Sequence, residues 1–506
     1  MSISVPLPVF VAVPLVMAFL LAIFGNKGRT AATILANLAT IALLIMALCS
    51  LGQTRMYLMG KWTIPLGINL VLDGLSSLML LAISVVSAAS MLFSAGYMEQ
   101  YTAKPKYFTL FLLMVAGMNG VVLSGDMFNL FVFLEIASLA SYALVGFGCE
   151  HEELEASFKY MVLGSIASMF VLFGVALMYA NTGSLNMAYI SAAIQSSGLN
   201  AGLAFALGLF ITGFGLKAAL VPFHAWLPDA HPSAPAPISA MLSGVLIKAL
   251  GVYAIARVLF NIFGVSIQVG WILVAMGLLS MTAGAFLAIG QWDLKRLLAY
   301  SSISQIGYVV LGIGLGGLIL AQKRNPAWAS LAILGGLFHL VNHAVYKSLL
   351  FLNSGSIEMA TGTRQLKQMG GLAEKMPVTR ATCTIASASI VGIPPFSGFW
   401  SKLILVIAAV QAGFYWIGAL IVFVSLCTLI MYLKVHRYAF LGELPENLEQ
   451  TEENEGSMLA AMVFLACLCI LMGLLLLPSL RQTLLEPAVK VLTDGIAYSA
   501  NIINIQ

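Results

Sequence analysis

Charged residues are scarce in this sequence. Only 9% of its 506 residues are Asp, Glu, Lys or Arg, whereas soluble domains carry about 25%. So few charges cannot cover a water-facing surface, and a net charge of +4 is too small and too dispersed for binding nucleic acid. With 60% hydrophobic residues and a mean hydropathy of +0.99, the chain is predicted to be a polytopic membrane protein.

Cysteine ligand patterns and catalytic motifs are also missing. The six cysteines form no CxxC pair and lie mostly in apolar runs, so we expect buried apolar thiols rather than zinc ligands, iron–sulfur ligands or a disulfide framework. Gly312, Gly314 and Gly317 match GxGxxG, but they lie inside an apolar run with no preceding strand, which favours helix packing. The sequence therefore predicts no cofactor, no metal site and no redox or hydrolytic centre.

Long apolar runs indicate the architecture. About 20 apolar residues span a bilayer, and this criterion predicts an all-α membrane protein of about fourteen transmembrane helices. These are residues 5–24, 30–51, 72–95, 107–124, 127–147, 157–180, 202–221, 237–260, 268–290, 297–319, 328–353, 379–410, 413–437 and 457–478. The first run lacks a preceding positive region, which argues against a signal peptide. We expect one transmembrane domain over 1–480 and an interfacial tail over 481–506.

Basic residues predict the orientation in the membrane. Loops after odd-numbered spans hold twelve Lys and Arg residues and loops after even-numbered spans hold five, so the odd loops should be cytoplasmic. The longest polar loop, between Arg437 and Ser457 with six glutamates, lies on that side. The protein is predicted to lie in the cell inner (plasma) membrane with both termini on the outer side.

Ionisable residues inside the apolar runs are the most informative feature. Near the bilayer centre each costs about 2.5–3.5 kcal/mol, so five cost roughly 12–17 kcal/mol, which argues against a purely structural role for the whole set. They are the carboxylate Glu135 and the lysines Lys217, Lys248, Lys347 and Lys402, with Lys159 close to a helix start. One carboxylate cannot neutralise four ammonium groups, so some lysines must be neutral or change protonation, as a proton relay requires. For any single residue, a paired packing role stays open.

His339, His343 and Lys347 follow one another at four-residue intervals in LFHLVNHAVYKSLLF. In a helix this spacing places them on one face, about 6 Å apart. Histidine exchanges protons near neutral pH, so this face is a candidate proton wire. A pair of hydrogen-bonded core histidines is the structural alternative. A metal site would need a third ligand, and haem ligation would need a facing histidine.

Two apolar runs are interrupted, each beside a buried lysine. Five prolines follow Lys217 in KAALVPFHAWLPDAHPSAPAP, and a Pro-Pro pair precedes Lys402 in GIPPFSGFWSK. Backbone breaks at membrane depth persist only where protein or a water-filled cavity satisfies the freed groups, and in transporters they mark the ion path. His224, Asp229 and His231 in the first break are candidates for a proton exit, with loop contacts as the alternative.

Four stretches carry a resemblance to a known family. They are FNLFVFLEIASLASYALVGF, GLKAALVPFHAWLPDAHPSAPAPISAMLSGVLIKALGVY, FHLVNHAVYKSLLFL, and GGLAEKMPV followed by GIPPFSGFWSK. Over residues 127–402 they resemble the antiporter-like membrane subunits shared by complex I, Mrp-type cation/proton antiporters and membrane-bound hydrogenases. This resemblance implies fourteen helices, a central hydrophilic axis and two inverted five-helix repeats with broken helices 7 and 12. The repeats are placed at 106–260 and 267–440.

The resemblance also assigns residues to the family's relay positions. The fifth-helix glutamate falls on Glu135, the seventh-helix lysine on Lys217 and the eighth-helix lysine on Lys248. The next relay position falls on the face of His339, His343 and Lys347, and the twelfth-helix position falls on Lys402. One complex I branch has glutamate at that last position, so lysine disfavours this branch. LGELPENLEQ and GGLAEKMPV look more like the Mrp and hydrogenase side.

Two classes of function remain. The first is a proton-pumping or cation/proton-exchanging subunit of a larger complex, whose partners are other membrane subunits, the lipid bilayer, protons and, in the exchanging form, sodium. The second is a non-conducting structural module that docks redox subunits. Buried charges favour the first class, since a scaffold would not need them. A stand-alone transporter of organic substrates would instead need a roomy polar pocket at the midplane.

Overall fold

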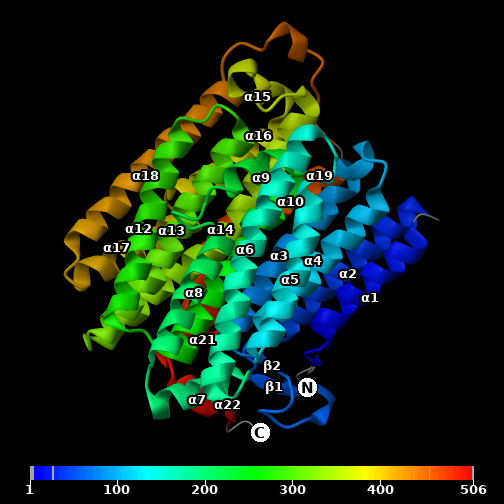
Figure 1. Ribbon diagram of the computed structural model, residues 1–506. Helices are drawn as coiled ribbons and strands as arrows, with labels where there is room; N and C mark the ends of the chain where they lie inside the picture. Colours follow the sequence, from blue (N-terminus) through cyan, green and yellow to red (C-terminus); the bar gives the residue numbers. More distant parts are fainter. Residues whose placement is uncertain (1–4, 26–27, 455, 504–506) are drawn as a thin grey trace.

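The computed structural model describes residues 5–25, 28–454 and 456–503. Within these ranges eleven helices are long and apolar enough to cross a membrane, and three shorter apolar helices, α1, α8 and α17, accompany them. They lie side by side in one bundle (Figure 1). Together they coincide with the fourteen predicted spans, and the all-α membrane fold is confirmed.

The helices follow the predicted order with small differences at their ends. The membrane helices begin with α1 (Val9–Phe24), α2 (Arg29–Cys49), α3 (Gly74–Tyr97), α4 (Lys104–Leu123), α5 (Met127–Val145), α6 (His151–Thr182) and α8 (Ala201–Lys217). The eighth span contains α10 (Ala236–Met241), η4 (Leu242–Leu246), η5 (Lys248–Tyr253), α11 (Ala254–Ala256) and η6 (Arg257–Phe263). The remainder are α12 (Ile267–Ile289), α13 (Leu294–Ala321), α14 (Pro326–Thr361), α16 (Pro377–Val391), α17 (Ser397–Gln411), α18 (Tyr415–Val435) with η8 (His436–Phe440), and α19 (Gly456–Leu471) with η10 (Met472–Leu476).

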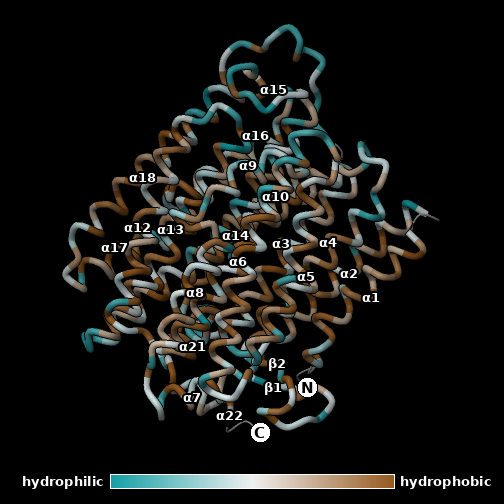
Figure 2. The backbone as a smooth tube through the Cα atoms, in the orientation of Figure 1, coloured by the Kyte–Doolittle hydropathy of each residue, from teal (hydrophilic) through white to brown (hydrophobic). Residues whose placement is uncertain are grey.

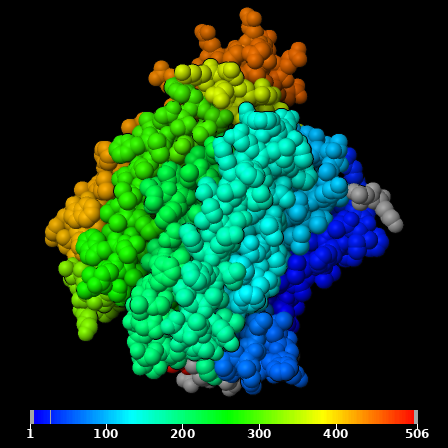
Figure 3. All heavy atoms as spheres, in the orientation of Figure 1, coloured from blue at the N-terminus to red at the C-terminus, as the bar shows by residue number. Residues whose placement is uncertain are grey.

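Smaller elements lie at the two ends of the bundle. One end carries the antiparallel hairpin of β1 (Arg55–Leu58) and β2 (Asn69–Leu72), with α7 (Met187–Ser197), α21 (Glu486–Thr493) and α22 (Ala497–Ile503) (Figure 1). The other end carries α15 (Leu372–Lys375) and the polar loop 441–454, which stands out above the body (Figure 3). Apolar residues dominate the helices between these ends, and hydrophilic ones gather at both (Figure 2). This banding matches a bilayer lying across the bundle.

Glycines allow the central helices to approach closely. A Cβ atom built on Gly312 of α13 would lie 2.7 Å from the Cα atom of Gly336 on α14, and one on Gly314 would lie 2.7 Å from the Cβ atom of Leu273 on α12. The GxGxxG sequence therefore serves helix packing, as predicted.

The cysteines differ from the sequence interpretation in part. Cys49, Cys149 and Cys467 are exposed and only the other three are buried, while all six are free thiols. Cys49 and Cys467 lie in apolar runs, and such a run facing lipid gives the same signal as one facing protein, whereas Cys149 lies in the turn between α5 and α6. The tail packs on the bundle end, because α21 contacts α3 and α14 and Leu492 is fully buried.

Both predicted breaks are present. The first separates α8, which ends at Lys217, from α9 (Leu227–Ser233), and the second separates α16 from α17. The backbone N–H of Val221 donates to Ser280 Oγ (2.9 Å), and Trp226 Nε1 donates to the carbonyl of Leu216 (2.9 Å). Side chains thus satisfy backbone groups freed by the first break, as membrane burial requires.

Candidate functional site

Glu135 and Lys217 face each other across α5 and α8. Lys217 Nζ lies 4.0 Å from Glu135 Oε1, and the lysine is buried while the glutamate side chain is 29% exposed. Lys217 donates hydrogen bonds to Ser138 Oγ (2.8 Å) and Tyr142 OH (3.2 Å). Ser168 of α6 donates to the Glu135 carboxylate. The structure therefore brings together the predicted pair and surrounds it with hydroxyl groups.

Sequence analysis missed these hydroxyl partners. Ser138 and Tyr142 lie three and seven residues after Glu135, intervals that place all three on one helix face. A search for hydroxyl groups at helical spacing around each buried charge would have found them. Ser168 comes from another helix, and no local spacing reveals it.

Lys248 lies in a span that is largely π-helical, through η4, η5 and η6. Its ammonium donates to the carbonyl oxygens of Ser243 (2.6 Å) and Gly244. Among the residues that the structure describes, the fully buried Lys248 forms no salt bridge. Two backbone carbonyls are its hydrogen-bond partners, in a type of helix that recurs at functional sites.

His343 and Lys347 lie on α14, both fully buried. Lys347 Nζ lies 3.4 Å from Tyr432 OH and 5.7 Å from the ring centroid of Phe351. Neither ring nitrogen of His343 forms a hydrogen bond with a protein group in the described ranges, whereas buried polar groups normally have a protein or water partner. His343 interacts electrostatically with both Lys248 and Lys347. It lies one helical turn before Lys347 on the same helix face.

His339 has a different environment on the same helix. Its Nδ1 lies 2.9 Å from Ser401 Oγ and its Nε2 lies 3.1 Å from Gln305 Oε1. The alternative of a hydrogen-bonded core histidine thus describes His339 but not His343. Ser401 immediately precedes Lys402 in the sequence, so His339 links α14 to the second break.

Lys402 of α17 reaches back across the second break. Its Nζ donates to the carbonyls of Ile390 (2.8 Å) and Val391 (3.1 Å), at the C-terminal end of α16, where the helix dipole favours a cation. It also lies 5.1 Å from the ring centroid of Tyr308. Lys402 lines a largely apolar cavity of about 350 Å³ between the break and α18. No carboxylate of the described chain forms a salt bridge with it.

His231 adds a buried histidine between the first break and the centre. It is fully buried, stacks on Phe351 with ring centroids 4.5 Å apart, and has no hydrogen bond from either ring nitrogen to a described protein group. It interacts electrostatically with Lys347 and Lys248. Lys347 Nζ lies 5.7 Å from the ring centroid of the same Phe351, so the structure brings His231 near Lys347, whereas the sequence placed it only in the break.

Lys159, His224 and Asp229 lie apart from this buried set. Lys159 pairs with Glu155 (2.8 Å) and Asp229 (3.3 Å), and Arg296 also pairs with Asp229 (3.2 Å). These charges line a polar cavity of about 410 Å³ at the end that carries α15. His224 is partly exposed in the break itself. Lys159 and Asp229 thus form a surface cluster, next to the buried His231.

We call the titratable groups inside the spans, six buried residues and the half-buried Glu135, the titratable axis. It comprises Glu135, Lys217, Lys248, His343, Lys347, His339 and Lys402. Its members come from both sides of the first break and from both sides of the second. Among the described residues, no group of three or more His, Cys, Asp or Glu side chains is arranged to hold a metal ion.

A family model for the transmembrane region of NADH:quinone oxidoreductase and Mrp antiporter subunits matches residues 124–428. The chain belongs to this family of antiporter-like membrane subunits. A second model, for the N-terminal part of chain 5 of NADH-ubiquinone oxidoreductase (complex I), matches residues 59–108. The antiporter-like chain is therefore a subunit type found in multisubunit membrane complexes, and the resemblance stated from its motifs is confirmed.

Relatives extend over almost the whole antiporter-like chain. NADH-quinone oxidoreductase subunit N of Desulforudis audaxviator is 36% identical over 449 residues, 87% of this chain and 86% of that protein. A Na(+)/H(+) antiporter subunit of Alkalihalophilus pseudofirmus is 33% identical over 482 residues, 94% of each chain. A subunit in the structure of the Mrp complex from Dietzia sp. DQ12-45-1b superposes with a TM-score of 0.88 at 30% identity, covering 98% of this chain and 99% of that one.

Proposed function

We propose that this chain is a proton-translocating subunit of a multisubunit complex and that protons move along the titratable axis. The observation that carries the proposal is the set of four buried lysines and two buried histidines on both sides of the two breaks, with the half-buried Glu135 beside Lys217. Burial disfavours the charged form of a lysine and a nearby carboxylate favours it, so the charge of a buried lysine depends on its neighbours. Such groups exchange protons when a neighbouring charge changes.

Each member of the axis has a proposed role. Glu135 controls the charge of Lys217, because its carboxylate lies 4.0 Å from the ammonium. Lys248 and Lys347 store protons near the centre, and His343 transfers protons between them. His339 passes the proton toward Lys402, which is the terminal donor beside the second break.

The surface cluster and His231 support a route to the axis. The polar cavity around Lys159 and Asp229 lies at the end with α15, and loop charges assign that end to the cytoplasm. We propose that protons pass between this cavity and the central lysines through His231. The same assignment places both termini on the outer side of an inner (plasma) membrane. The repeats are proposed at 106–260 and 267–440.

Cation/proton exchange is the second form of this function. The relative from Alkalihalophilus pseudofirmus is named a Na(+)/H(+) antiporter subunit, and carboxylate oxygens such as those of Glu135 are the ligand type that hard metal cations prefer. The other candidate is a non-conducting module that docks redox subunits. It is less favoured, because it leaves the buried charges of the axis without a role.

Replacement of Glu135 by Gln tests the proposal. The complex containing Glu135→Gln should assemble but lose proton translocation in proteoliposomes, because the neutral amide no longer controls Lys217. Glu446→Gln is the control, since Glu446 is exposed in the polar loop 441–454 and does not line the cavity around Lys159 and Asp229. Sodium uptake is recorded in the same vesicles. Unchanged translocation by Glu135→Gln would favour the docking module.

A further inference from the structure

His339 of α14 is held by hydrogen bonds to side chains of two other helices. Its Nδ1 atom lies 2.9 Å from Ser401 Oγ of α17, and its Nε2 atom lies 3.1 Å from Gln305 Oε1 of α13. All three residues are fully buried. The proposed function gives a role to His339 but none to Ser401 or Gln305, although each occupies one of its two ring nitrogens.

Gln305 determines which ring nitrogen of His339 keeps a hydrogen. A carbonyl oxygen only accepts hydrogen bonds, so Nε2 carries a hydrogen and donates it to Gln305 Oε1. The hydroxyl oxygen of Tyr346, 3.3 Å from the same nitrogen, is a second acceptor for this hydrogen. A neutral imidazole has only one N–H. Nδ1 is therefore the atom at which His339 takes up a further proton.

Ser401 offers a hydrogen-bond partner to Nδ1 in either protonation state. Its hydroxyl oxygen lies 2.9 Å from Nδ1 and 3.1 Å from the carbonyl oxygen of Gly398. When His339 is neutral, the hydroxyl group donates to Nδ1. When His339 is protonated, Nδ1–H donates to Ser401 Oγ and the hydroxyl hydrogen points to the Gly398 carbonyl. A hydroxyl group is both donor and acceptor, so both states keep their hydrogen bonds without movement of any heavy atom.

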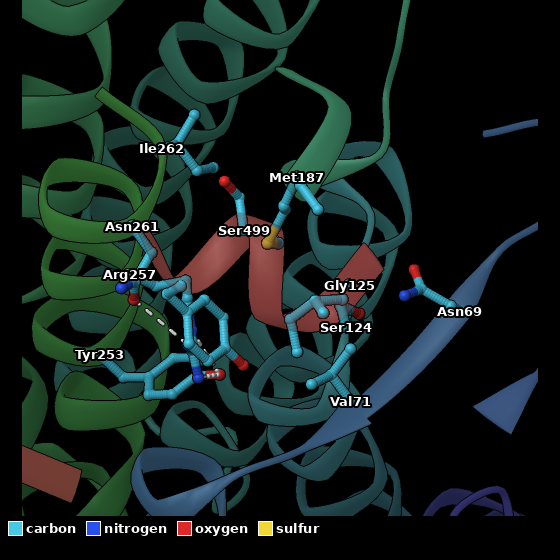
Figure 4. Close-up of a pocket in the computed structure, with 13 residues that line it drawn as sticks. Asn69, Val71, Ser124, Gly125, Met187, Tyr253, Arg257, Asn261, Ile262 and Ser499 are labelled. Carbon is cyan, nitrogen blue, oxygen red and sulfur yellow. Dashed lines mark hydrogen bonds between the residues drawn. The ribbon is translucent and has the colours of Figure 1, made fainter. Parts of the chain in front are cut away.

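A buried charge that does not change has a different environment. Arg257 of the eighth span forms a salt bridge of 2.8 Å with Asp73 Oδ2, and it donates hydrogen bonds to Tyr253 OH and Asn261 Oδ1 (Figure 4). Arginine stays charged in proteins, and the carboxylate compensates that charge. The hydrogen-bond partners of His339 in the described chain are instead neutral hydroxyl and amide groups. No opposite charge holds its imidazole in the protonated form.

The titratable groups that face His339 come from four elements. They are Lys402 of α17, Lys248 of η5, Tyr308 of α13, and His343 and Tyr346 of α14 itself. Both lysines interact electrostatically with the imidazole. A positive charge nearby opposes a further proton on the ring. Loss of a proton from Lys402 therefore favours uptake of a proton by His339.

We propose that His339 exchanges its proton at Nδ1 through the Ser401 hydroxyl and that Gln305 holds the imidazole in the orientation that this exchange needs. This inference rests on the proposed function. A protonated water or an ammonium group of the axis gives a proton to Ser401 Oγ, while the hydroxyl hydrogen passes to Nδ1. The new hydrogen on Oγ then turns to the Gly398 carbonyl, and release of the proton reverses these steps. Ser401 is thus a relay residue and Gln305 a positioning residue.

Substitutions of Ser401 test the relay in the assembled complex. Ser401→Ala removes the hydroxyl and should lower driven proton translocation in proteoliposomes at least tenfold. Ser401→Thr keeps a hydroxyl and should retain more than half of the wild-type rate. Ser397→Ala is the matched control and should leave the rate unchanged. Ser397 is buried one helical turn earlier on α17, and its contact with Asn342 (3.1 Å) is made by its backbone carbonyl.

Replacement of Gln305 by Glu gives a pH signature that general damage would not produce. A carboxylate beside Nε2 favours the protonated imidazole. Gln305→Glu should therefore translocate at least tenfold more slowly at neutral pH and recover when the pH is raised by about one to two units, because His339 then loses its proton again. Gln305→Leu should stay slow at every pH. Gln411→Glu, at the exposed end of α17, should keep the wild-type pH profile.

The outcomes separate this inference from the proposed function. Wild-type translocation by Ser401→Ala, or equal losses by Ser401→Ala and Ser401→Thr, would overturn the relay. A loss by Gln305→Glu that does not recover with pH would overturn the positioning role. Should Gln305→Glu fail to assemble, the two Ser401 variants decide. The proposed function fails separately, if driven translocation survives Glu135→Gln.

Discussion

Lys217 is closer to Ser138 than to Glu135. Its ammonium lies 2.8 Å from the Ser138 hydroxyl oxygen but 4.0 Å from the Glu135 carboxylate, which is engaged by Ser168. The opposite charges are therefore near each other without being in direct contact. A small movement of either side chain would strengthen or break their interaction, and this is the property that a switching pair needs.

Ser138→Ala should lower translocation roughly tenfold. A hydrogen bond to a charged group contributes about 1.5–3 kcal/mol, and without it Lys217 should move toward a direct pair with Glu135. The rate is measured in proteoliposomes with the intact complex. Ser141→Ala is the control, because Ser141 lies on the same helix but bonds Tyr160 (3.0 Å). Equal effects of the two variants would contradict the role of Ser138.

His343→Leu should stop translocation while leaving thermal stability almost unchanged. His343 has no hydrogen bond to a described protein group, so its removal leaves no protein partner unsatisfied. His339→Leu should lose both translocation and thermal stability. It leaves Ser401 and Gln305 without their hydrogen-bond partner, which costs about 1–3 kcal/mol of folding free energy for each unsatisfied buried group. Thermal unfolding and transport are measured on the same preparations. Equal destabilisation by both variants would count against this distinction.

Lys402→Ala should uncouple ion movement from the driving reaction. Lys402→Arg should impair driven translocation almost as strongly as Lys402→Ala. Arginine remains charged in proteins, so it keeps the hydrogen bonds to the end of α16 but cannot release a proton. The control is Lys434→Arg, because Lys434 also donates to two backbone carbonyls but lies near the end of its span. Normal translocation by Lys402→Arg would make Lys402 a fixed counter-charge.

A cysteine at Glu446 in the polar loop should react with impermeant reagents only from the cytoplasmic side. A cysteine at Leu66, in the hairpin at the other end and 85% exposed, should react only from outside. Both variants are made in a background in which the exposed cysteines Cys49, Cys149 and Cys467 are replaced by serine. They are labelled in intact cells and in inverted vesicles. The reverse pattern would invert the orientation predicted from the loop charges.

Much of the architecture could be predicted because the bilayer constrains it strongly. Length and hydropathy suffice to find spans, and all fourteen predicted ranges coincide with helices or broken helices. The β1–β2 hairpin and α7 were not predicted, since they are short elements outside the apolar runs. Helix ends moved by several residues, as at α14, which continues to Thr361 through polar residues.

The site was predictable residue by residue but not in its contacts. Lys217 and Lys402 were recognised as charges beside broken helices, yet one bonds side-chain hydroxyls and the other backbone carbonyls. Arg257 is one of the five basic residues that the orientation count assigned to the loops after even-numbered spans, but it is buried against Asp73. Its partner lies 184 residues away, and no local pattern connects two such positions.

The unlike environments of Lys217 and Lys402 give the proposed path a direction. Loss of a proton from Lys217 leaves the Glu135 carboxylate without its counter-ion, whereas loss of a proton from Lys402 leaves only the carbonyl dipoles of α16. The work of discharging one end therefore differs from the work of discharging the other. A chain of titratable groups with such different ends conducts protons more easily in one direction than in the other. Forward and reverse proton currents under equal and opposite driving forces should therefore be unequal.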